Sequence, residues 1–154
     1  MYLNRRHRDN HKEGDLHYVL LGETVSEVNG QVEGKIKEEK SGVILKLQLS
    51  GLLSDTSVLR MLIDEENAER KRYDAKEALV DKIPTGQLVI ASRSDKDVSI
   101  TFGDGNKAVL TLNPFRIDIY KNDRITISGN QRGLLKFEHF RQKGDGEVSF
   151  HTSL

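Results

Sequence analysis

The chain has 154 residues, enough for one domain with a substantial hydrophobic core, and its 24 Lys and Arg balance its 24 Asp and Glu. This balance leaves no net field to attract nucleic acid or an anionic membrane, so we expect neither as a partner. The absence of cysteine excludes disulfides, thiolate catalysis and sulfur-ligated zinc, and no stretch approaches the roughly 20 apolar residues that span a bilayer.

Residues 1–14 form a polar N-terminal tail by composition. Residues 1–12 lack the apolar core of a signal peptide, so we expect the chain as written to be untargeted. His7 and His11 are spaced one helical turn apart, as metal ligands can be, but no third ligand accompanies them and a solvated tail is favoured. We therefore predict no metal site. After the tail we predict one folded domain at residues 15–154, incomplete at its C-terminal end.

Short runs of β-forming residues follow one another through the first half of the domain. Alternation is clearest at residues 43–49, where apolar Leu45 and Leu47 share one face and Lys46 points to the other. The Asn29-Gly30 dipeptide is a strong hairpin signal. The pattern predicts four strands, at residues 17–24, 31–37, 43–49 and 58–64, with a turn at 54–57.

Residues 64–81 have a different composition, dominated by Ala, Glu, Lys and Arg with few and weakly periodic apolar residues. Because a helix without an apolar stripe gains little from packing, we expect a surface excursion with one helical turn at 75–79. The acidic run Asp64-Glu65-Glu66 beside Arg70-Lys71-Arg72 raises the question of an acid-base pair or a cation site. A solvated, self-neutralising loop is the favoured interpretation.

The second half contains stronger strand signals, at residues 87–92, 98–102, 108–112 and 134–139, with a short apolar and polar run at 148–153. A three-residue loop is expected to pair Val98, Ile100 and Phe102 with Leu112, Leu110 and Ala108. A second three-residue loop at 121–123 is expected to place Ile119 opposite Ile125 and Ile117 opposite Ile127, so that Arg116 and Asp118 face outward together.

Two further motifs contain residue types that occur in binding or catalytic sites. Gly103-Asp104-Gly105-Asn106 has the composition of a phosphate-binding loop, but no helix follows it, so a plain hairpin turn is favoured. His139 has the chemistry of a general base, but a single strand histidine without a nucleophile is usually structural. We predict no catalytic, metal or cofactor site in this chain.

About nine short strands with turn signals every 8 to 12 residues, and no alternation of strands with helices, predict an all-β antiparallel β-sandwich. A β-sandwich alone is also compatible with a free-standing carbohydrate-binding or interaction module. The chain has no Trp and only 6% aromatic residues, which leaves little material for stacking sugars.

A family resemblance rests on two stretches of the second half. These are Asn113-Pro114-Phe115-Arg116-Ile117-Asp118-Ile119 and Arg132-Gly133-Leu134-Leu135-Lys136-Phe137-Glu138-His139, with weaker support from Arg60, Ile63-Asp64-Glu65 and Arg72-Tyr73. With them the chain resembles the N-terminal, galactose mutarotase-like domain of glycoside hydrolase family 31, in the glucosidase II and neutral α-glucosidase group. The chain departs from that group at residues 74–79, where the family's Val-Pro-Asp-Val-Leu run is replaced.

The resemblance implies a non-catalytic sandwich that serves as scaffold for a catalytic barrel located farther along the same polypeptide. It also implies that the parent enzyme removes α-linked glucose from N-glycans in the lumen of the endoplasmic reticulum, with a glucosidase II β subunit as partner. A (β/α)8 barrel typically needs about 250 residues, so we expect the catalytic carboxylates to lie outside this chain.

Overall fold

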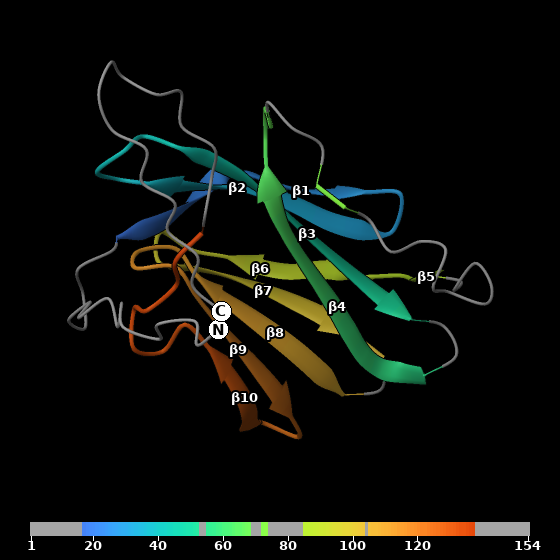
Figure 1. Ribbon diagram of the computed structural model, residues 1–154. Coiled ribbons are helices and arrows are strands. Elements are labelled where there is room, and N and C mark those ends of the chain that lie inside the picture. The colour runs from blue at the N-terminus through green and yellow to red at the C-terminus, as the bar shows by residue number, and fades with distance from the viewer. Residues whose placement is uncertain (1–16, 53–54, 69–71, 74–84, 104, 138–154) are drawn as a thin grey trace, which may run out of the picture.

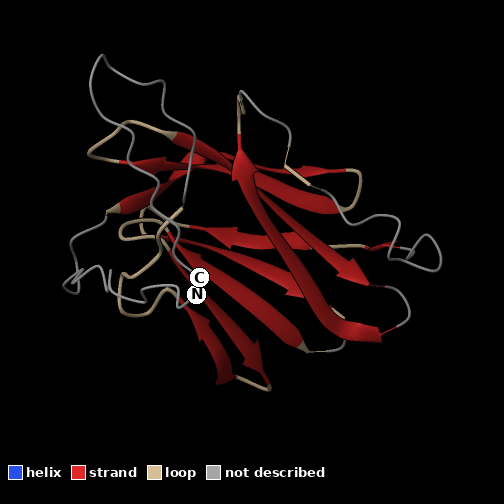
Figure 2. Ribbon diagram, in the orientation of Figure 1, coloured by secondary structure: helices blue, strands red, loops and turns tan. Residues whose placement is uncertain are grey.

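The computed structural model describes residues 17–52, 55–68, 72–73, 85–103 and 105–137. All the regular structure in this part of the chain is β-strand (Figure 2). Among these segments there is no helix with the length and apolar character needed to cross a bilayer. The predictions for residues 1–14, 75–79 and 148–153, and for His139, lie outside the described residues.

Two five-stranded antiparallel sheets face each other (Figure 1). Sheet A has the order β1-β2-β3-β4, with β5 pairing to β3, and sheet B has the order β10-β9-β8-β7-β6. The strands of sheet A are β1 (Tyr18–Val28), β2 (Gln31–Glu38), β3 (Ile44–Leu52), β4 (Asp55–Glu65) and β5 (Thr85–Gly86). Those of sheet B are β6 (Val89–Arg93), β7 (Asp97–Phe102), β8 (Asn106–Thr111), β9 (Arg116–Lys121) and β10 (Arg124–Gly129). The predicted all-β sandwich is confirmed.

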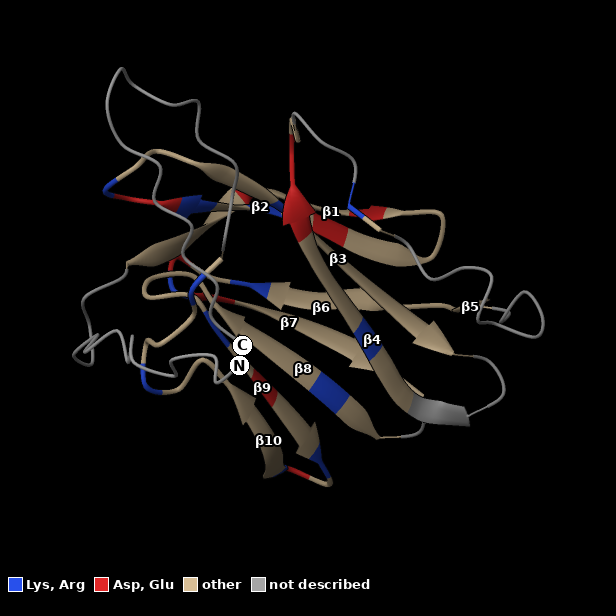
Figure 3. Cartoon of the chain, viewed as in Figure 1, with Lys and Arg blue, Asp and Glu red and all other residues tan. Residues whose placement is uncertain are grey.

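The core lies between the sheets because every second residue of the central strands is apolar. Its largest fully buried side chains from the two sheets include Leu20, Ile36, Leu45, Leu47, Leu49, Val98, Ile100 and Leu110. Lys46 is exposed on the opposite face of β3, as the alternation predicted. Charged residues of both signs are spread over the surface strands without a large region of one sign (Figure 3).

Several predicted boundaries were wrong. β1 continues to Val28, β4 begins at Asp55 within the predicted turn 54–57, and the described residues 134–137 form no strand. The Asn29-Gly30 turn is confirmed, with positive φ values of 52° and 76° at the two residues. Asn and Gly tolerate this left-handed conformation, which a two-residue hairpin turn requires.

The predicted three-residue loop between β7 and β8 is confirmed, but the predicted register of the two strands was wrong by two residues. Val98 pairs with Leu110 and Phe102 with Asn106, so that three residues, 103–105, connect the strands. Gly103 and Gly105 both have positive φ, 51° and 72°, which lets the chain reverse close to the end of β7 and start the ladder earlier. A shift of two residues keeps every apolar side chain on the core face, and the apolar pattern could not detect it.

The predicted loop between β9 and β10 was also wrong. Lys121 pairs with Arg124 across a two-residue turn, in which Asn122 and Asp123 have φ values of 49° and 59°. A register shift between Ile125 and Ile127 then places Ile125 opposite Tyr120 and Ile127 opposite Ile119. This irregularity puts Ile125 and Ile127 on opposite faces of sheet B, which simple alternation did not predict.

β9 contains buried residues whereas β10 is largely exposed, and this difference gives the first prediction. Replacing Ile117, which is 6% exposed, by Asp is expected to unfold the chain, since an unpaired buried carboxylate costs about 3 to 5 kcal/mol of the free energy of unfolding. Ile127→Asp is a matched control on the adjacent strand and is expected to cost less than about 1 kcal/mol, because Ile127 is 64% exposed. Urea unfolding followed by circular dichroism compares the two, and equal midpoints would contradict the burial assignment.

Candidate functional site

The two stretches that carry the family resemblance meet at Asn130, directly after β10. Its Nδ2 donates a hydrogen bond to the Phe115 carbonyl at 2.6 Å, and its Oδ1 accepts one from the Leu135 N–H at 2.8 Å. Asn130 has a φ of 58°, a left-handed conformation that turns the chain back toward Phe115. One side-chain amide therefore holds residues of both stretches together.

Tyr18, the first residue of β1, is a second connection between these stretches. Its carbonyl accepts a hydrogen bond from the Phe115 N–H at 2.7 Å, and its hydroxyl accepts one from the Phe137 N–H at 3.0 Å. Burial raises the pKa of Tyr18 above its ordinary value, the Phe137 hydrogen bond opposes the shift, and the charge of Glu38 adds to it. The hydroxyl is thus a neutral group with a structural role.

Arg72 connects strand β4 of sheet A to Phe137, in the second of these stretches. Its guanidinium forms ion pairs with Asp64 at 3.3 Å and with Glu65 at 3.0 Å, and it lies over the Phe137 ring, 4.6 Å from the centroid. A guanidinium stacked on an aromatic ring is favourable in addition to its ion pairs. We call the group Tyr18, Arg72, Phe115, Asn130 and Phe137 the junction.

The acidic run Asp64-Glu65-Glu66, a candidate for acid-base chemistry, is paired with cationic side chains. Arg72 pairs with Asp64 and Glu65, and Lys35 of β2 pairs with Glu66. Arg70 and Lys71 lie outside the described residues. The predicted neutralisation is confirmed for the described members of the run, but the predicted loop was wrong for Asp64 and Glu65, which end strand β4, and Glu66 is paired by Lys35 from outside the run. A carboxylate engaged by a guanidinium is poorly suited to be a free base or nucleophile.

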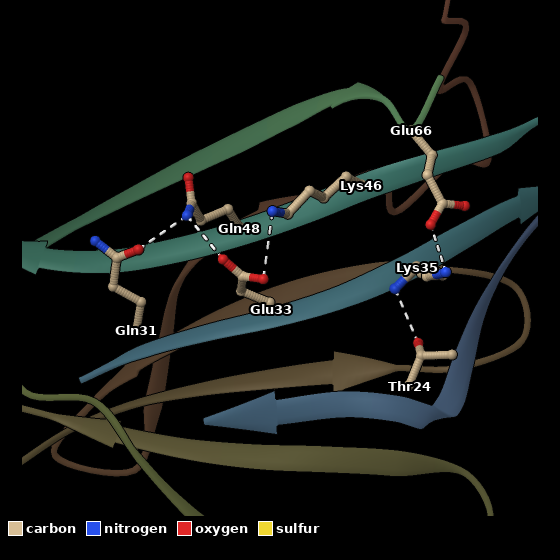
Figure 4. Close-up of polar contacts among 7 residues, drawn as sticks. All are labelled: Thr24, Gln31, Glu33, Lys35, Lys46, Gln48 and Glu66. Atoms are coloured by element: carbon tan, nitrogen blue, oxygen red, sulfur yellow. Dashed lines mark hydrogen bonds and ion pairs between the residues drawn. The ribbon is translucent and has the colours of Figure 1, made fainter. Parts of the chain in front are cut away.

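The outer face of sheet A carries a ladder of polar side chains (Figure 4). The Gln48 Nε2 donates to the Gln31 Oε1 at 2.9 Å and to the Glu33 Oε1 at 3.0 Å. Lys46 pairs with the other Glu33 oxygen at 3.3 Å. These polar groups thus satisfy one another, and the described strands of this face present no aromatic platform on which a sugar could stack.

Asp118, predicted to face outward with Arg116, is buried at 5% exposure. The two do lie together, since Arg116 Nη2 and Nε are both 2.9 Å from Asp118 Oδ1. The Ser128 hydroxyl donates to the same oxygen at 2.6 Å. The expectation of an exposed pair was therefore wrong for Asp118, whose carboxylate joins β9 to β10.

The remaining candidates supply no reactive site within the described residues. Asn106 opens β8 rather than a helix, which confirms the hairpin interpretation of the glycine-rich loop. A search of the described residues finds no group of three His, Asp or Glu side chains able to hold a metal ion. His7 and His11 are outside the described part of the chain. The arrangement around the junction fixes segments in space and offers no nucleophile with a base.

Tyr18 and Asn130 are members of the junction that the sequence pattern does not indicate as functional residues. Asn130 could have been found, because Ser128-Gly129-Asn130 is a turn signal after a strand and Asn tolerates positive φ. Tyr18 could not, because its partner Phe137 is 119 residues away and no local pattern encodes such a contact.

Comparison with known proteins shows which proteins the chain is similar to. A family model described as the glycosyl hydrolase 31 N-terminal galactose mutarotase-like domain matches residues 46–154. Neutral alpha-glucosidase AB of Sus scrofa is 38% identical over 104 residues, which are 67% of this chain and 11% of that protein. Neutral alpha-glucosidase C of Homo sapiens is 28% identical over 145 residues, which are 88% of this chain and 16% of that protein.

Solved structures agree with these matches. The glucosidase II alpha subunit in its Glc1Man2-bound form superposes with a TM-score of 0.72 and 26% identity, over 84% of this chain and 16% of that one. The catalytic subunit in an ER glucosidase II heterodimeric complex, with the binding domain of its regulatory subunit, gives the same values. The chain thus spans 11% to 16% of the length of the relatives it matches.

Two substitutions of Asn130 distinguish how much its hydrogen bonds and its backbone conformation each contribute to the free energy of unfolding. Asn130→Ala is expected to lower the free energy of unfolding by about 2 to 3 kcal/mol, because two hydrogen bonds are lost and Ala disfavours positive φ. Asn130→Gly loses the same bonds but relieves the backbone, and is expected to cost about 1 kcal/mol less than Ala. Urea unfolding measures both, and equal costs would contradict a role for the backbone conformation.

A second prediction concerns Glu38, buried at the end of β2. Burial alone would raise its pKa, but hydrogen bonds from the Ser41 hydroxyl and from the N–H groups of Ser41 and Lys40, with the Lys40 charge, lower it below its ordinary value. The stabilisation is therefore present above the unfolded-state pKa and is lost as the pH falls through the lowered folded-state pKa.

Glu38→Gln is expected to cost about 1 kcal/mol at pH 7, and the difference from the unsubstituted chain should shrink below roughly pH 4, where glutamate titrates. Glu39→Gln, at the exposed neighbouring position, is the matched control and is expected to change little at either pH. Thermal unfolding at pH 7 and pH 3 tests this. A Glu38→Gln deficit that persists undiminished at pH 3 would refute it.

Proposed function

The chain belongs to the glycosyl hydrolase 31 family as its N-terminal galactose mutarotase-like domain, and from this premise we propose that it is the non-catalytic scaffold of a glucosidase II-like α-glucosidase. The observation that supports the proposal most directly is the family-model match over residues 46–154. In addition, Glu33 and Glu65 of the described structure are engaged in ion pairs. The catalytic barrel would lie in the same polypeptide outside these 154 residues.

A retaining glycosidase needs a carboxylate nucleophile and a carboxylic acid about 5 Å apart on either side of the glycosidic bond. In the described residues Asp64 and Glu65 share Arg72, Glu33 pairs with Lys46, and Asp118 is held by Arg116 and Ser128. None of these carboxylates is free to attack a sugar. The junction instead supports a positioning role, since it fixes residues 130–137 against both sheets.

The substrate class follows from the relatives. Structures of the glucosidase II alpha subunit were solved with Glc1Man2 and with alpha3-Glc2, so we propose α-linked glucose on mannose-containing N-glycans as the substrate of the parent enzyme. A regulatory subunit occurs in the related ER complex, and we propose a β subunit as partner and the lumen of the endoplasmic reticulum as location. We also propose that residues 15–154 are one part of a larger sandwich.

The test is an activity assay of the purified chain. No hydrolysis of p-nitrophenyl α-glucoside above background is expected, while porcine neutral alpha-glucosidase AB provides the positive control. An Asp64→Asn, Glu65→Gln double variant separates contamination from true turnover. Turnover by the unsubstituted chain that disappears in the double variant would assign catalysis to this chain and overturn the scaffold function.

A further inference from the structure

The inner face of sheet B becomes progressively uncovered toward β10. Ile100, Ala108, Ile119 and Ile127 stand opposite one another in a single row across β7, β8, β9 and β10. Ile100 and Ala108 are 0% exposed, Ile119 is partly buried, and Ile127 is 64% exposed. Ile127 thus occupies a core-facing position on which, within the described residues, nothing packs closely.

The edge strands differ in whether their backbone groups bond to residues outside their own sheet. At the β6 edge the Leu88 N–H donates to the Gly30 carbonyl at 2.9 Å, and the Ile90 N–H donates to the Glu27 carboxylate. At the β1 edge the Leu20 N–H donates to the Leu112 carbonyl at 2.8 Å. In the part of the chain that the structure describes, β10 pairs with β9 alone.

The β10 edge also lacks the usual protection of a solvent-exposed strand. Natural edge strands are guarded by charged side chains, proline or cover from another segment. β4, the edge of sheet A, carries Arg60, Asp64 and Glu65. β10 carries one charge, Arg124, at its start, followed by the uncharged run at residues 125–129. Such an edge is suited to pairing with another strand.

We propose that β10 receives a further β-strand from the part of the glycosyl hydrolase polypeptide that lies outside this chain, an inference that rests on the function proposed above. Residues directly after β10 turn away through Asn130 and Gly133, and Phe137 bonds to Tyr18, so the described continuation does not pair with β10. The relatives are far longer than this chain, which covers 11% to 16% of them. The added strand places an apolar side chain beside Ile127 and extends the core past β9.

Hydrogen exchange of the isolated chain and of the full-length polypeptide that carries it tests the inference. The amides of residues 124–129 are expected to exchange at least about tenfold more slowly in the full-length protein, whereas those of β6 are expected to exchange equally in both. Equal exchange at β10 would overturn the proposal. Protection already present in the isolated chain that grows with its concentration would assign the edge to a second copy and overturn it too.

Matched variants supply an independent readout. In the isolated chain Ile127→Lys and Val89→Lys, which replace residues 64% and 44% exposed, are both expected to shift the Tm by no more than about 2 °C. In the full-length protein Ile127→Lys is expected to lower the Tm by several degrees and Val89→Lys to leave it unchanged. Equal effects of the two in the full-length protein would contradict the proposal.

Hydrolysis of an α-glucoside by the full-length protein is measured in the same preparations. If the unsubstituted full-length protein does not hydrolyse the α-glucoside, the proposed function is contradicted. Slower amide exchange at β10 in the full-length protein would still support the added strand.

Discussion

The structure depends on the packing of two inner faces against each other. Within each sheet the strands pair through backbone hydrogen bonds, and such ladders do not by themselves hold two sheets together. Between the sheets lie Leu45, Leu47 and Leu49 from β3 and Val98 and Ile100 from β7, all at most 1% exposed. Burial of these side chains, at about 25 cal/mol per Å² of apolar surface, is the main force that brings the sheets together.

A small set of long-range polar contacts then fixes how the sheets lie. The Glu27 carboxylate and the Gly30 carbonyl of the first hairpin accept from backbone amides at β6, while Leu20 and Tyr18 bond to the segment after β8. Packing alone is non-directional, whereas hydrogen bonds at defined positions select one arrangement. The junction belongs to this second class of contacts, and both stretches that carry the family resemblance take part in it.

The sequence was sufficient for the faces of β3 and insufficient for the faces of β10 and for the exact residue pairs of the hairpins in sheet B. Leu45, Leu47 and Lys46 lie where a period of two placed them, because burial on one face of a sheet leaves a local signature. The residue pairs predicted between β7 and β8 and between β9 and β10 were wrong. Positive φ at Gly103 or Asn122 and an irregularity beside Ile127 change the register without changing the apolar pattern. Within the junction, the contact between Tyr18 and Phe137 spans more than a hundred residues, which no local window of sequence contains.

The contact between Tyr18 and Phe137 has a consequence for biosynthesis. The two residues are 119 positions apart, and a ribosome adding about 5 to 20 residues per second needs roughly 6 to 24 s to synthesise the intervening chain. During that time β1 exists without the groups that bond to its first residue. Leu20 and the remaining core-facing residues of β1 are then open to chaperones, and β1 would be among the last of the described strands to be fixed in place although it is the first of them to be made.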